Sequence, residues 1–269
     1  MITEWLAAYL ALGALVGFFA GLLGVGGGGI MVPLLTTMFA AQGFPTEHLL
    51  HVALGTSMAS IVFTSLASLR AHHAHGAVNF RTVRHITPGI LTGTLGGSFI
   101  ASRIPTAPLA LFFACFTLMV SLQMVSNAKP QPTRQLPGPL GLASVGTGIG
   151  LISALVAIGG GSLSVPFMTW CNVRMKEAIG TSAAIGLPIS LAGAVGYLIT
   201  GSGVTGLPAH CWGYLYFPAL LSISVVSSCT APLGARLAHR LPVTTLKKIF
   251  SGVLLLLSAK MLHTLFWKP

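Results

Sequence analysis

The chain has 269 residues, of which 54% are hydrophobic and only 6% are charged. A soluble globular domain carries about 25% charged residues, so these few polar groups cannot cover the surface of a water-soluble protein. The net charge of +11 comes from basic residues in short connectors, without interleaved aromatic residues, which indicates a membrane surface and not a nucleic acid as the partner.

An all-α polytopic membrane protein is therefore expected, and its first half contains four apolar spans. They lie at 5–24, 49–69, 86–102 and 107–126. The first span ends in an unusual glycine-rich motif, L-L-G-V-G-G-G-G-I-M-V-P, from Leu22 to Pro33. Glycine clusters and proline disfavour a helix interior, so the helix should break here. The apolar piece after the break, 30–41, is too short to cross a bilayer core of about 30 Å and predicts a re-entrant half-helix.

The second half follows the same order. A proline-rich segment at 129–138 is expected to link two membrane repeats, 1–128 and 139–269. A second break, L-V-A-I-G-G-G-S-L-S-V-P, runs from Leu155 to Pro166 and precedes another short apolar piece at 163–171. The apolar spans of this half lie at 139–158, 178–199, 211–233 and 246–266.

Three blocks recur in the same order in both halves, which predicts an internal duplication. The two glycine-rich breaks are the first. The second is A-L-G-T-S-M-A at 53–59, matched by A-I-G-T-S-A-A at 178–184, and the third is Arg-Ile-Pro at 103–105, matched by Arg-Leu-Pro at 240–242. With about eight full spans the two halves run parallel, whereas crossing half-helices would give five spans per half and inverted halves. We favour eight spans.

The two breaks are the candidate substrate-binding site. Non-helical backbone at membrane depth is tolerated only where it is buried in protein or lines a polar cavity. The first amides of each half-helix are unpaired and carry the positive end of the helix dipole, which suits a small anion, and a proline is tolerated in the first turn. Tight helix packing by small residues is the alternative. The backbone candidates are Gly26, Gly27, Gly28, Gly29, Gly159, Gly160, Gly161 and Ser162.

Paired hydroxyl residues follow each break, Thr56 with Ser57 and Thr181 with Ser182. Their hydroxyl groups can donate hydrogen bonds to an anion without bringing a charge into the membrane. Alternatively, Ser and Thr side chains bond back to a carbonyl one turn earlier in their own helix. Because the pairs recur beside the duplicated breaks, all four residues are included in the candidate site.

Other polar residues lie near connectors, and no metal centre or cofactor is predicted. A histidine cluster could bind a transition metal, but no acidic or cysteine partner lies close in sequence, so a solvated loop is favoured. Arg103 and Arg240 could attract anions or anchor the ends of spans, and we favour anchors. No Asp or Glu lies inside an expected span, so proton coupling would use a histidine, an edge carboxylate or the anion itself. The clustered histidines are His72, His73, His75 and His85.

The chain resembles the TauE/SafE-type sulfite exporters, also called the sulfonate-uptake permease family. The resemblance rests on G-G-G-G-x-x-x-P at 26–33, G-G-G-S-x-x-x-P at 159–166 and the A-[LI]-G-T-S blocks that follow. It implies an integral transporter of the bacterial cytoplasmic membrane. The implied cargo is a small sulfur-containing oxyanion such as sulfite, sulfoacetate, thiosulfate or a related organosulfonate. The motifs are specific for the family and not for the substrate, because members differ widely.

Other functions remain as alternatives to this expectation. The same architecture could carry another small anion or a divalent metal ion. An intramembrane enzyme with Ser162 as nucleophile would need a histidine base at membrane depth, and every histidine lies near an expected connector or span end. A non-transporting scaffold would not explain two breaks in register. The expected partners are a small anionic substrate and the lipid bilayer, and a homo-oligomer is compatible with the sequence.

Overall fold

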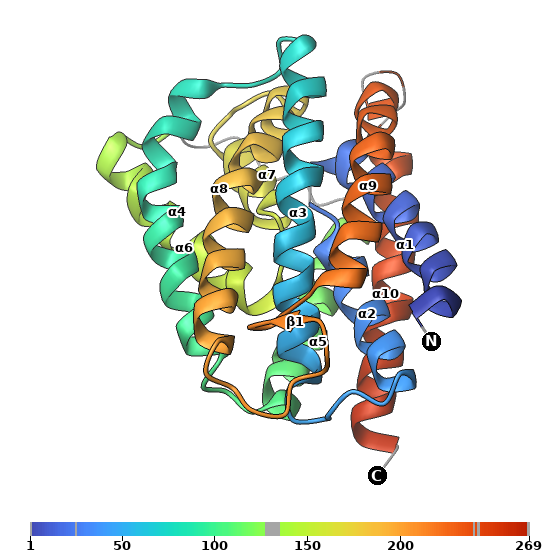
Figure 1. Ribbon diagram of the computed structural model, residues 1–269. Coiled ribbons are helices and arrows are strands. Elements are labelled where there is room, and N and C mark those ends of the chain that lie inside the picture. Colours follow the sequence, from blue (N-terminus) through green and yellow to red (C-terminus); the bar gives the residue numbers. More distant parts are fainter. Residues whose placement is uncertain (1, 25, 127–134, 239, 241–242, 268–269) are drawn as a thin grey trace.

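A computed structural model describes residues 2–24, 26–126, 135–238, 240 and 243–267. The described residues form an all-helical bundle with one small β-hairpin (Figure 1). The helices of the first half are α1 (Ile2–Leu23), α2 (Gly28–Ala41), α3 (Leu49–Ala74), α4 (Phe80–Ala101) and α5 (Thr106–Val125). Those of the second half are α6 (Pro139–Val156), α7 (Gly161–Trp170), α8 (Met175–Gly201), α9 (Phe217–Ala238) and α10 (Val243–Trp267). The hairpin strands are β1 (Cys211–Trp212) and β2 (Leu215–Tyr216).

Each of the eight expected spans falls on a helix, but six of the described helices have both the length and the hydropathy of a membrane span. The short α2 and α7 are the expected half-helices, about 21 Å and 15 Å long at 1.5 Å per residue. The span expected at 211–233 begins as the β-hairpin, so α9 starts only at Phe217. An all-α polytopic membrane protein is confirmed, while the number eight is not. The six helices are α1, α3, α5, α6, α8 and α9.

Helix α1 packs on α9 through a row of glycines. A β-carbon on Gly13 would meet the backbone of Ile223, and a β-carbon on Gly21 would meet the backbone of Ala231. Residue numbers rise together along the two helices, so α1 and α9 run parallel. Small residues let two backbones approach closely, which is how helices pack where lipid removes the hydrophobic driving force.

Helix α4 packs on α6 in the same way. A β-carbon on Gly89 would meet the backbone of Ala143, and a β-carbon on Gly97 would meet Leu151. These two helices therefore also run parallel. In Figure 1 the α4–α6 pair and the α1–α9 pair lie on opposite sides of the central helices α3 and α8. Helix α3 is the most enclosed of the six helices that could span a membrane. In its most apolar stretch 72% of the residues are buried, against 39% in α9.

The matching helices α3 and α8 run antiparallel. Gly193 of α8 lies against Met58 of α3, while Gly186 lies against Ser65. The numbers fall along one helix as they rise along the other. Helices α5 and α10 are also antiparallel, since Thr117 bonds Ser258 and Ser121 bonds Ser251. The expectation that corresponding helices run parallel is therefore wrong.

The half-helices account for this difference. Helix α2 turns back along α1, because Gln42 Nε2 donates to the Tyr9 hydroxyl over 2.6 Å. The far end of α1 reaches the other end of α3, where the Gly21 carbonyl lies 3.0 Å from His72 Nε2. Thus α1 and α2 together begin and end at the same side, and the first half makes an odd number of passes. The second half does the same, because Leu136, before α6, and Cys171, after α7, line one surface pocket. This geometry is that of the five-pass, inverted alternative.

The two halves do not form separate bodies. The five most extensively packed helix pairs, α1–α9, α4–α6, α3–α8, α3–α9 and α5–α10, each join one half to the other. The expected linker at 129–138 is described only from residue 135 onward, and residues 129–134 lie outside the described ranges. Of the repeated Arg-Leu-Pro block, residues 241–242 also lie outside them.

Candidate functional site

The first break separates α1 from α2. Helix α1 ends at Leu23, and the chain then passes through Gly24 and Gly26, with φ angles of 67° and 79°. Gly27 precedes α2 with a φ of 79°. L-residues with side chains rarely adopt these left-handed conformations, so the glycines allow the chain to reverse here. Val25 lies outside the described residues.

The second break separates α6 from α7 and has a similar backbone. Ala157 follows α6 with a φ of 45°, and Gly160 precedes α7 with a φ of 79°. The sequence does not predict this left-handed conformation, because the residue is an alanine. When the two breaks are aligned on their prolines, Ala157 corresponds to Gly24 of the first break. Pro33 and Pro166 lie in the second turn of their half-helices, not in the first turn as expected. A proline there lacks an N–H, so the carbonyl four residues earlier loses its usual helical donor.

The two breaks touch each other at the centre of the bundle. A β-carbon on Gly26 would lie 2.7 Å from the Gly159 α-carbon, and a β-carbon on Gly28 would overlap the Ala157 carbonyl oxygen. Ile61, near the midpoint of α3, is the other neighbour of Gly26. The residues of both breaks are buried, so the unwound backbone faces protein and not lipid. The buried residues are Gly26, Gly27, Gly28, Gly29, Gly159, Gly160, Gly161 and Ser162.

Two of the expected hydroxyl residues have no hydrogen-bond partner. The side-chain oxygens of Ser57 and Ser162 are buried and make no hydrogen bond within the described residues. Ser162 lies in the first turn of α7, immediately after the second break, and Ser57 lies on α3. An unsatisfied buried hydroxyl costs about 1–3 kcal/mol, so a ligand that accepts its hydrogen bond is favoured there.

The other hydroxyl residues are already engaged. Thr56 Oγ1 accepts a hydrogen bond from the backbone N–H of Tyr216 over 3.0 Å, and Thr181 Oγ1 accepts one from the backbone N–H of Asn79 over 2.9 Å. Ser182 donates to the Gly24 carbonyl at the edge of the first break. The two threonines therefore hold connectors in place, a role that their spacing in the sequence did not indicate.

The hairpin β1–β2 covers the start of α3 without adding charge. Burial raises the pKa of the Cys211 thiol to about 12, and burial also raises the pKa values of the Tyr214 and Tyr216 hydroxyls. All three groups are therefore neutral at physiological pH. Tyr216 packs against Phe39 and Phe44, with ring centroids 5.5 Å and 5.1 Å apart. An aromatic cluster thus fills this end of the bundle.

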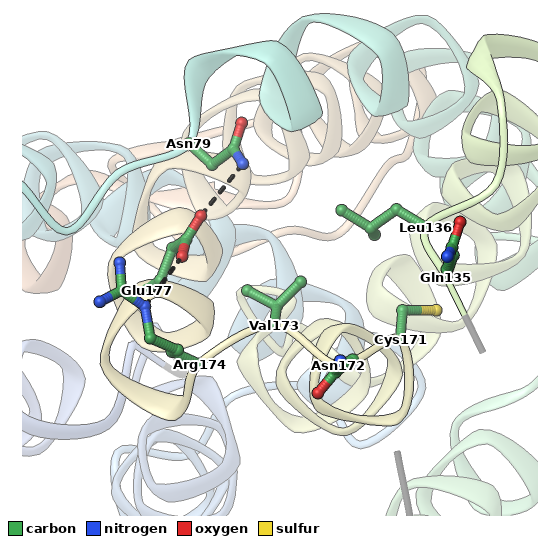
Figure 2. Close-up of a pocket in the computed structure, with 8 residues that line it drawn as sticks. All are labelled: Asn79, Gln135, Leu136, Cys171, Asn172, Val173, Arg174 and Glu177. Atoms are coloured by element: carbon green, nitrogen blue, oxygen red, sulfur yellow. Dashed lines mark hydrogen bonds and ion pairs between the residues drawn. The ribbon is translucent and has the colours of Figure 1, made fainter. Parts of the chain in front are cut away.

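A surface pocket of about 330 Å³ lies at the end of α7 and the start of α8 (Figure 2). Glu177 accepts a hydrogen bond from Asn79 Nδ2 over 3.1 Å and lies 3.7 Å from Arg174 Nε. The carboxylate is therefore held between an amide and a guanidinium group. The lining residues are Asn79, Gln135, Leu136, Cys171, Asn172, Val173, Arg174 and Glu177.

The histidine cluster differs from the expected solvated loop. His72 is fully buried in the last turn of α3 and bonds the Gly21 carbonyl, while His73 and His75 are exposed. No group of three or more metal-ligating side chains lies together in the part of the chain that the structure describes. Arg103 and Arg240 are exposed near the ends of α4 and α9.

A polytopic helical bundle whose two helix breaks meet at its buried centre is the architecture of a membrane transporter. The chain belongs to the sulfite exporter TauE/SafE family, whose model matches residues 9–261. The family consists of membrane transporters and not of enzymes.

Curated relatives cover nearly the whole chain. A probable membrane transporter protein of Haemophilus influenzae is 37% identical over 253 residues, which cover 94% of this chain and 96% of the relative. The probable membrane transporter proteins YdhB of Bacillus subtilis and MJ0441 of Methanocaldococcus jannaschii are each 25% identical. Their alignments cover 87% and 91% of this chain and 90% and 91% of the relatives, respectively. No solved structure matches the chain significantly.

Proposed function

We propose that the protein transports a small sulfur-containing oxyanion, bound where the two breaks meet. Sulfite, which the description of the family names, is the first candidate cargo, and sulfoacetate, thiosulfate and related organosulfonates are the others. The observation that carries this proposal is the unpartnered buried hydroxyl of Ser162 at the start of α7, together with that of Ser57, which lies one helical turn before Ile61, the α3 residue that contacts the first break. Both hydroxyls can donate to the oxygens of the anion.

The helix dipoles favour an anion at this place. Each helix N-terminus behaves as about half a positive charge, so α2 and α7 together offer nearly one charge to a bound monoanion. Amide and hydroxyl donors also match the several oxygens of a sulfur oxyanion. A divalent metal ion would meet the same positive ends and would be repelled. The converging N-termini therefore favour an anion over a metal cargo.

We also propose that residues 1–128 and 139–269 are inverted repeats around this site. The pairing of α1 with α9 has its counterpart in the pairing of α6 with α4, and α3 contacts α9 as α8 contacts α4. Inverted repeats with substrate held between discontinuous helices are a common basis of alternating access, in which the two repeats exchange conformations. The expected duplication and its antiparallel helices fit this scheme.

Transport assays in proteoliposomes test the cargo directly. Saturable uptake of radiolabelled sulfite, reduced by excess thiosulfate and without parallel uptake of nickel, is the expected result. Gly27→Leu and Gly160→Leu should each abolish sulfite flux, because both positions have a φ of 79°. Gly148→Leu is the control, since nothing lies within 4 Å of a β-carbon there. Nickel uptake without sulfite uptake would overturn the proposed cargo.

A further inference from the structure

Thr56 and Thr181 lie on opposite sides of the contact between the breaks. Gly26 contacts α3 at Ile61, and the Gly159 carbonyl lies 3.0 Å from a β-carbon built on Gly186 of α8. Each threonine precedes that level by about 7.5 Å along its own helix, at a rise of 1.5 Å per residue. Because α3 and α8 run antiparallel, one threonine lies toward each face of the membrane.

On one face, Thr56 holds the hairpin. The bond from the Tyr216 backbone N–H reaches Thr56 Oγ1 at the residue immediately before α9. The neighbouring Tyr214 donates its backbone N–H to the Tyr197 carbonyl over 3.3 Å. A β-carbon on Gly55 would lie 2.5 Å from the Tyr214 carbonyl oxygen. The hairpin therefore packs directly on α3 and lies between the breaks and this face of the membrane.

On the other face, Thr181 holds the connector between α3 and α4. The bond from the Asn79 backbone N–H reaches Thr181 Oγ1 at the residue immediately before α4. The Asn79 side chain also bonds Glu177 and, through its oxygen, accepts from the Thr82 backbone N–H. The two threonines therefore receive equivalent bonds, each from the residue that immediately precedes a long helix of the other half. Tyr216 precedes α9 and bonds Thr56, and Asn79 precedes α4 and bonds Thr181.

The spaces outside the two bonds differ. The pocket of about 330 Å³ reaches Asn79 and Glu177 from the surface, and Figure 2 shows both side chains at its wall. On the hairpin face, Tyr216 is packed against Phe39 and Phe44. The pocket therefore reaches Asn79, the donor of the Thr181 bond, while aromatic side chains pack against Tyr216, the donor of the Thr56 bond.

We propose that Thr56 and Thr181 are the two gate residues of the transporter. Each hydroxyl holds one connector closed over the central breaks, and releasing one bond at a time opens the site to one face. Both are positioning residues that do not touch the cargo. The inference rests on the proposed transport function and not on the identity of the anion.

Site-specific labelling tests the gates. The reporter is Ser162→Cys in a protein whose Cys115, Cys171, Cys211 and Cys229 are replaced by alanine. Sealed vesicles of either orientation are treated with a membrane-impermeant maleimide. Thr181→Val should raise labelling roughly two- to tenfold from the Asn79 face alone, as expected for one lost hydrogen bond, and Thr56→Val should do so from the hairpin face alone. Thr181→Ser and Thr56→Ser keep the hydroxyl and should restore slow labelling.

Thr147→Val is the matched control, because this exposed side chain bonds only the Ala143 carbonyl of its own helix. It should leave labelling unchanged from both faces. Equal labelling from both faces, accompanied by a lower unfolding temperature, would assign the threonines a purely structural role and overturn the gates. Unchanged labelling in both valine variants would overturn them as well. No cargo is needed, so a protein that fails the sulfite test can still pass this one.

Discussion

Gly28 lies so close to Ala157 that a β-carbon on the glycine would overlap the alanine carbonyl oxygen. This contact joins the start of α2 to the end of α6, and so joins the first break to the second. The distance between the two half-helix N-termini therefore depends on a position that tolerates no side chain. A proposed site made of both N-termini is sensitive to any change there.

Gly28→Ala is expected to abolish transport and to destabilise the fold. The added methyl group must push the breaks apart, and overpacking of this kind costs about 1–3 kcal/mol. Flux in proteoliposomes and thermal unfolding in detergent measure the two effects. Gly96→Ala, at an open position on α4, should leave both near wild type. Normal flux in Gly28→Ala would show that contact between the breaks is not required.

Ser57→Ala and Ser162→Ala are expected to weaken transport without weakening the fold. Each change removes a buried hydroxyl that has no protein partner, so stability should stay the same or rise slightly, while the KM for sulfite should increase. Ser60→Ala is the matched control, because its hydroxyl bonds the Thr56 carbonyl one turn earlier on the same helix. An unchanged KM in both variants would remove these serines from the site.

The sequence predicted the breaks because their glycines have a direct backbone meaning. The positive φ angles at Gly26, Gly27 and Gly160 require residues of this kind. That the breaks meet each other is less accessible, since Ala157 adopts a left-handed conformation that nothing in its identity announces. Motifs that recur in a sequence predict that two sites correspond, but not that they touch.

The direction of the two halves was missed for a physical reason. Whether the halves are parallel or inverted depends on whether the number of passes in each is even or odd. A helix as short as α2 leaves that number open, because the unwound residues before it also cover part of the membrane depth. The bond between Gln42 and Tyr9 settles the path, and it joins residues that no local pattern pairs.

The roles of the hydroxyl residues were separable only in three dimensions. Ser57 and Thr56 are adjacent in the sequence, yet one hydroxyl has no partner and the other accepts the Tyr216 backbone N–H. Successive helical residues point about 100° apart, so adjacent side chains meet different neighbours. The donor lies far along the chain, in a hairpin that had been expected to form part of a span.

Cys211 is expected to react very slowly with maleimides at neutral pH. Thiolate is the reactive form, and burial raises the pKa of this thiol to about 12. At pH 8 its thiolate fraction should be on the order of a thousandfold below that of an ordinary cysteine with a pKa of about 8.5. The rate should rise about tenfold per pH unit and level off only near pH 12.

The measurement uses a protein in which Cys115, Cys171 and Cys229 are alanine, so that Cys211 alone is labelled. The same protein unfolded in detergent is the control, and there the rate should level off near pH 9. A plateau near pH 9 in the folded protein would show that the hairpin does not bury this thiol as the structure describes.

Inverted halves predict that corresponding connectors lie on opposite faces of the membrane. Ala74 ends α3, and Gly203 follows α8, the matching helix of the second half. Because α3 and α8 run antiparallel, Ala74→Cys should be labelled from one face and Gly203→Cys from the other. Impermeant maleimide and sealed vesicles of known orientation, with all four native cysteines replaced by alanine, measure this directly.

Thr46→Cys provides the internal control for that experiment, because it lies in the connector before α3 and is exposed. It should share a face with Gly203→Cys and not with Ala74→Cys. Parallel halves would instead place Ala74→Cys and Gly203→Cys on the same face. That result would contradict the antiparallel contacts of Met58 with Gly193 and of Ser65 with Gly186. It would also place the two threonine gates on one side of the membrane, where they could not alternate.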